Sequence, residues 1–139
     1  MNYLEGKEIS AALQKTYRVY LCGNLSKPQE ELQWVHDEQI EIGISCYSEF
    51  TADKPHLHSE ATEYNYILEG SSKFYIIDED KELVFESGSL FIVPPNTKYA
   101  TKHLEGTKIL FIKSPGCNDK QLIDISSELQ KWLQTWSEI

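Results

Sequence analysis

The sequence has few cysteines, and none of them lies in a paired motif. Cys22, Cys46 and Cys117 are odd in number and widely spaced, with no CxxC among them. This pattern argues against a disulfide framework, so we expect reduced thiols, most simply as small buried side chains.

Long apolar runs are also missing, and none approaches the length that spans a membrane. The first residues, Met1 to Glu5, lack the basic-then-apolar order of a signal peptide. We therefore expect a cytoplasmic protein with no membrane partner.

Positive charge is scarce. Thirteen Lys and Arg residues stand against 22 Asp and Glu residues, the formal net charge is −9, and Arg18 is the single arginine. Nucleic acids and anionic membrane surfaces are polyanions, so this balance argues against both as partners. The acidity itself is most simply a source of solubility.

Internal repeats and low-complexity linkers are absent, so we expect one domain over residues 1–139. Most of it reads as short strands about ten residues apart with turn residues between them, a pattern typical of an all-β sandwich or barrel. Residues 40–46 alternate apolar and other side chains, as a half-buried strand does. The spacing predicts a core barrel over about 38–115, preceded by a helical turn at 10–15 and a strand at 17–22.

The C-terminal tail changes period. Its apolar residues recur at three- and four-residue steps, which predicts one helix face over about 126–139: Ile125, Leu129, Trp132, Leu133, Trp136 and Ile139. Ser126 is the expected N-cap. Such a helix could cover a barrel opening or meet a partner subunit, or simply pack on its own sheet.

The most informative segment contains His56, His58 and Glu63. Side chains alternate along a strand, so the two imidazoles point the same way, roughly 6–7 Å apart. A turn through residues 59–62 can bring Glu63 back to face them. Two imidazoles and one carboxylate around open positions form a known catalytic arrangement for zinc or non-haem iron.

These residues resemble the cupin superfamily. In its first motif, G-x5-H-x-H-x3,4-E-x6-G, the pair His56 and His58, Glu63 and Gly70 all fit, while Phe50 replaces the leading glycine. In the second motif, G-x5-P-x-G-x2-H-x3-N, Gly88 and Pro94 fit. Asn96 replaces the glycine, Tyr99 the histidine and His103 the asparagine. The resemblance implies a double-stranded jelly-roll β-barrel with an internal pocket, often as a homodimer.

Tyr99 is the main departure, because metal-binding cupins usually carry a third imidazole there. A neutral phenol is a poor ligand, so Tyr99 either becomes deprotonated on a metal or donates a hydrogen bond. Asn65 shares the parity of Glu63 and should point into the barrel, where its amide needs partners. A bound ligand, a backbone group or a buried water would each serve.

Three functions stay open. The first is a metal-dependent enzyme, of oxygenase or isomerase type, in which His56, His58 and Glu63 hold Fe, Mn, Zn or Ni and Tyr99 lies beside the metal. The second is a metal-free sugar or sugar-nucleotide isomerase or epimerase, with His58 as base and Tyr99 as acid. The third is a module that binds a sugar or another metabolite without catalysis.

Overall fold

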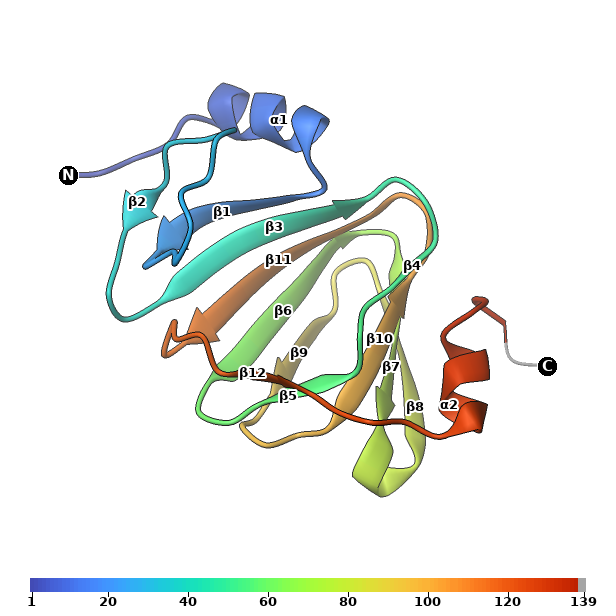
Figure 1. Cartoon of the computed structure of the whole chain (residues 1–139). Coiled ribbons are helices and arrows are strands. Elements are labelled where there is room, and N and C mark those ends of the chain that lie inside the picture. Colours follow the sequence, from blue (N-terminus) through green and yellow to red (C-terminus); the bar gives the residue numbers. More distant parts are fainter. Residues whose placement is uncertain (138–139) are drawn as a thin grey trace.

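Strands dominate the computed structural model, which describes residues 1–137 (Figure 1). The elements, in chain order, are α1 (Gly6–Lys15), β1 (Arg18–Gly23), β2 (Val35–His36), β3 (Glu41–Tyr47), β4 (Thr51–Ala52), β5 (His56–His58), β6 (Thr62–Glu69), β7 (Ser71–Ile76), the 3-10 helix η1 (Ile77–Glu79), β8 (Lys81–Glu86), β9 (Leu90–Val93), β10 (Tyr99–His103), β11 (Thr107–Ser114), β12 (Lys120–Leu122) and α2 (Ser127–Trp132). The predicted all-β class is confirmed.

The strands form two six-stranded sheets. The first has the order β2-β1-β3-β11-β6-β9, and the second has the order β12-β5-β10-β7-β8 with β4 paired to β10. The sheets lie as two layers of a barrel, and neighbours within each come from distant parts of the chain (Figure 1). The sheets extend beyond the predicted range of 38–115, since β1, β2 and β12 lie outside it.

The predicted alternation at residues 40–46 is present in β3, and the buried residues are Gly43, Ser45 and Tyr47. The isoleucines of this strand lie on the opposite, outer face. Gly43 is needed there because a Cβ atom would lie 2.2 Å from the Phe111 ring. Polar and small residues thus face the barrel interior, which is the first sign that it holds a site.

An aromatic and aliphatic cluster fills part of the interior; its buried members are Tyr47, Ile67, Phe74, Phe91, Val93, Tyr99 and Ile109. The Phe74 ring stacks on Tyr99 with centroids 4.6 Å apart and meets Phe91 edge-on at 4.9 Å. This packing fixes the Tyr99 ring, so the position of its hydroxyl is determined by the core.

The two helices cover different parts of the barrel. Helix α1 packs on β1 through a cluster containing Ala12, Val19 and Leu32. It is longer than the predicted turn at 10–15. Neither helix is long and apolar enough to span a membrane.

The C-terminal helix is shorter than predicted, because α2 ends at Trp132. Leu129 and Trp132 pack against Ala100 on the second sheet. Of the three predicted arrangements, the helix therefore adopts the one in which it packs on its own sheet. Ser126 is the N-cap, as predicted, and accepts a hydrogen bond from the Leu129 N–H. The predicted contribution of Ile139 lies outside the described residues.

Candidate metal centre

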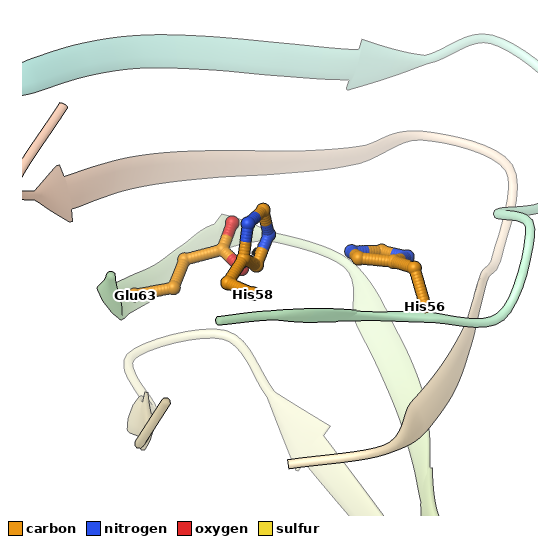
Figure 2. Close-up of side chains that lie close together, drawn as sticks. All are labelled: His56, His58 and Glu63. Carbon is orange, nitrogen blue, oxygen red and sulfur yellow. Dashed lines mark ion pairs between the residues drawn. The ribbon is translucent and has the colours of Figure 1, made fainter. Parts of the chain in front are cut away.

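The centre is built by two neighbouring segments, β5 and the start of β6. His56 and His58 project from the same side of β5 with ring centroids 5.1 Å apart, and they are only 8% and 7% exposed. Glu63 enters from β6, and one ligand atom from each of the three residues lies within 4.8 Å of the others. Figure 2 shows both imidazoles and the carboxylate turned toward a shared space.

Each imidazole is held by its Nδ1 atom. His56 Nδ1 lies 2.7 Å from the Lys54 carbonyl oxygen, and His58 Nδ1 lies 2.9 Å from Asp119 Oδ1. Since a carbonyl oxygen and a carboxylate can only accept, both Nδ1 atoms carry the proton. The Nε2 atoms are therefore left to face the shared space, as in metal-ligating histidines whose other nitrogen donates outward.

Asp119 was missed by the sequence reasoning. Its second oxygen accepts the backbone N–H groups of Glu60 and Ala61 at 2.9 and 2.7 Å, which fixes the turn between β5 and β6. Partial burial opposes ionisation, but these hydrogen bonds and the one from His58 lower the Asp119 pKa to about 2. No spacing signal pointed to this carboxylate, because it lies 61 residues after His58 and meets it only through the β5–β12 pairing.

Tyr99 lies between two of the three ligand groups. Its hydroxyl is 2.8 Å from Glu63 Oε2 and 2.8 Å from His56 Nε2. Burial and the neighbouring Glu63 carboxylate raise the Tyr99 pKa well above its usual value. Tyr99 is therefore a neutral phenol that can donate one hydrogen bond.

These groups together lack protons. Burial lowers the His56 pKa to about 4, so its ring is neutral near pH 7, and its Nε2 competes with Glu63 for the single phenolic proton. His58 Nε2 lies 3.6 Å from Glu63 Oε2. A cation would satisfy such a group of lone pairs, and two imidazoles with a carboxylate suit iron, manganese, zinc or nickel. The residues present therefore fit a divalent metal with small side-chain adjustments.

The centre opens into a cavity of about 580 Å³ inside the barrel, a size suited to a small-molecule ligand. Asn65, from β6, lines this cavity and is buried. Its side chain makes no hydrogen bond to any residue that the structure describes, so the amide is available to a ligand. The predicted inward orientation of Asn65 is thus confirmed.

A second polar cluster lies deeper along β10. His103 Nε2 is 3.0 Å from Asp53 Oδ2 and its Nδ1 is 2.7 Å from Ser72 Oγ, while the ring stacks on Tyr47 at 4.1 Å. Ser72 is fully buried, so this chain of hydrogen bonds is structural. His103 is therefore a buried structural residue and not a metal ligand. His36 and Glu60 are exposed and do not line the cavity.

Two facing sheets closed around an imidazole–carboxylate centre define a jelly-roll barrel protein with an internal site. Residues 47–112 match the family model described as the Cupin domain. This match covers both motifs, so the resemblance is confirmed for residues 47–112.

Solved structures with the same fold share little sequence with this chain. Pac13 of Streptomyces, a nucleoside dehydratase solved with uridine, has a TM-score of 0.56 and 17% identity over 68% of this chain and 76% of its own. KdgF from a Halomonas species has a TM-score of 0.54 and 18% identity over 62% and 77%. The polyketide cyclase RemF from Streptomyces resistomycificus has 0.56 and 16% over 71% and 70%. At such identities the likeness shows the fold alone. Comparison with the curated proteins gives no match.

Proposed function

We propose that this protein is a metal-dependent enzyme, of oxygenase or isomerase type, that acts on a small polar substrate inside the barrel. His56, His58 and Glu63 would hold a divalent ion of Fe, Mn, Zn or Ni. The observation that carries the proposal is the convergence of two imidazole Nε2 atoms, on rings fixed from behind through Nδ1, on a carboxylate in a cavity.

The bound ion would supply a Lewis acid, or a binding position for dioxygen if it is iron. The other roles belong to the chain itself. Tyr99, a neutral phenol, can donate a hydrogen bond or a proton to a substrate oxygen next to Glu63. Asn65 offers an unpaired amide that can orient the substrate. The packed rings of Phe74 and Phe91 exclude water from this side of the cavity.

The first test is metal content after purification from metal-replete medium, measured by mass spectrometry of the elements. We expect wild-type protein to retain about one divalent ion per chain, and His56→Ala and His58→Ala to lose it, because each removes one of three ligands. His36→Ala is the matched control, since this exposed imidazole bonds to Glu38 and does not line the cavity. A metal-free wild type whose melting temperature no divalent metal raises would contradict the proposal.

A second candidate is metal-free acid–base catalysis on a sugar or sugar nucleotide by His58 and Tyr99. The hydroxyl of Tyr99 lies within the ligand cluster, as an acid would, although its direct imidazole contact is His56 and not His58. Turnover by EDTA-treated protein that Tyr99→Phe abolishes would favour this candidate. Binding of a sugar without any turnover would favour a non-catalytic module.

A further inference from the structure

The single arginine of this acidic chain lies in the same cavity as the metal centre. Arg18 stands opposite Ser45 in the β1–β3 pairing, and Ser45 faces the barrel interior. Residues paired across β1, β3, β11 and β6 form rows on the interior face of the first sheet. Three successive rows contain Glu63, Asn65 and Arg18, in that order. Arg18 and the metal ligands therefore flank the free amide of Asn65.

The guanidinium of Arg18 is fixed by uncharged groups and not by a direct ion pair. Its Nε donates to Ser45 Oγ at 2.9 Å, Tyr47 makes a side-chain hydrogen bond with it, and its Cζ lies 5.6 Å from the centroid of the Phe111 ring. Within residues 1–137 no carboxylate oxygen lies within 4.0 Å of it. The planar group is thus held in one orientation without an ion-pair partner.

Lys120 brings a second cation to this cavity. It pairs with His58 across the β5–β12 ladder, so the two side chains share a face of the sheet, and it lines the cavity. Partial burial of this largely exposed side chain lowers its pKa, the Asp53 charge opposes that shift, and the Arg18 charge adds to it. Among the described residues it has no ion pair either.

The acidic groups nearby are already engaged. Asp53 is bonded to His103 and Thr101, and Asp119 to His58 and two backbone N–H groups. Two other lysines line the cavity: Lys27 is exposed, and Lys113 lies 3.6 Å from Glu41 and 3.9 Å from Asp119. Arg18 and Lys120 thus line the cavity without a direct ion pair among residues 1–137, although the charge of Asp53 acts on both. An anionic ligand would relieve their mutual repulsion.

We propose that Arg18 and Lys120 bind a carboxylate of the ligand, so that the substrate is a small organic acid. A guanidinium presents paired N–H donors that match the planar carboxylate. The acid would extend past Asn65, with its reacting end at His56, His58 and Glu63. That placement of the reacting end rests on the proposed metal-dependent function, whereas the anion site does not.

The test uses glutarate as the probe and its neutral diamide as the matched ligand. Calorimetry follows binding to manganese-loaded and to EDTA-treated protein. We expect glutarate to bind more tightly than the diamide, and Arg18→Met and Lys120→Gln each to weaken glutarate about tenfold in both preparations. Lys108→Met is the control, because this lysine lies outside the cavity near Glu69. Since Lys120 is exposed, its variant should fold even if the Arg18 variant does not.

Each outcome has a separate meaning. If manganese does not bind but both variants weaken glutarate, the anion site stands and the metal function falls. If manganese binds and the variants leave glutarate affinity unchanged, the anion site is wrong and the metal function stands. Failure of glutarate to bind wild type better than the diamide would also overturn the inference. Inorganic phosphate binding more tightly than glutarate, with the same dependence on Arg18, would overturn the carboxylate assignment.

Discussion

At the scale of single residues, the site depends on how each imidazole is held from behind. The Lys54 carbonyl fixes His56, and Asp119 fixes His58. The first is backbone and cannot be removed by substitution, but the second can. Asp119 therefore offers a way to change the centre without touching a ligand.

We predict that Asp119→Asn lowers metal affinity about tenfold while the protein still folds. Loss of a carboxylate behind a metal-ligating histidine typically costs 10- to 100-fold in affinity, and the amide oxygen can still accept a hydrogen bond. Competition with a chelator of known affinity measures the metal affinity of each variant. Asp124→Asn, at an exposed position, should leave the metal affinity unchanged. Equal affinities for the two variants would show that Asp119 does not support the centre.

Several residue positions could be predicted from the sequence, because strand parity and turn chemistry are local. Asn96, in place of the motif glycine, has φ 63°, the left-handed conformation that asparagine tolerates best after glycine. The convergence of His56, His58 and Glu63 followed from the period of two and a short turn. Asp119 and Arg18 could not be predicted, because their neighbours are set by sheet pairing between distant strands.

At the scale of elements, β10 carries polar groups along its whole length, and all five of its residues are buried. The predicted barrel range of 38–115 includes this strand, but the sequence does not indicate that both of its faces are covered. Its outer face is covered by α2, where Lys102 donates to the carbonyl oxygens of Trp132 and Thr135. Its inner face holds His103 against Asp53. Strand period alone cannot reveal such coverage, because it depends on where the tail packs.

The Asp53–His103 contact predicts an acid-dependent loss of stability. Burial opposes ionisation of Asp53, but hydrogen bonding to His103 and the charges of His103 and Arg18 lower its pKa to about 2, from an ordinary 3.8. Because the Asp53 pKa is lower in the folded than in the unfolded protein, ionised Asp53 stabilises the fold fully above about pH 4. This stabilisation is lost as the pH falls toward 2. A difference of nearly two pKa units corresponds to about 2 kcal/mol.

Urea unfolding between pH 7 and pH 2 checks this prediction. Asp53→Asn should be less stable than wild type by up to about 2 kcal/mol at pH 7, and the gap should close as the pH approaches 2. Asp124→Asn should follow the wild-type curve throughout. A gap that stays constant over the whole range would mean that the contribution of Asp53 does not come from its charge.

At the scale of the whole molecule, one face of the barrel is apolar, and no helix within residues 1–137 covers it. The outer apolar face is made of paired rows on β3, β11, β6 and β9, namely Ile42, Ile44, Tyr64, Tyr66, Leu90, Ile92, Leu110 and Ile112. Leu90 and Ile92 are 59% and 51% exposed. Helix α1 lies over β1 and α2 lies on the other sheet (Figure 1). Contiguous apolar patches of this kind mark interaction surfaces.

The homodimer expected from the family resemblance stays a prediction, and this face is where we expect it. Two molecules of charge −9 repel each other, but the eight residues of the outer apolar face carry no charge. Ile92→Glu should convert a dimer to a monomer in sedimentation analysis, because it buries an unpaired charge in each subunit. Val84→Glu is the control, since Val84 is 48% exposed on the second sheet. A monomeric wild type, or equal behaviour of both variants, would contradict the prediction.

The central claim is that His56, His58 and Glu63 bind one metal ion, and anomalous diffraction tests it most directly. Crystals of wild-type protein grown with manganese or zinc should be measured on both sides of the absorption edge of that metal. The account predicts one anomalous peak about 2.0–2.3 Å from both Nε2 atoms and from the Glu63 carboxylate. Density at this position without an anomalous peak, or a peak only at other residues, would contradict it.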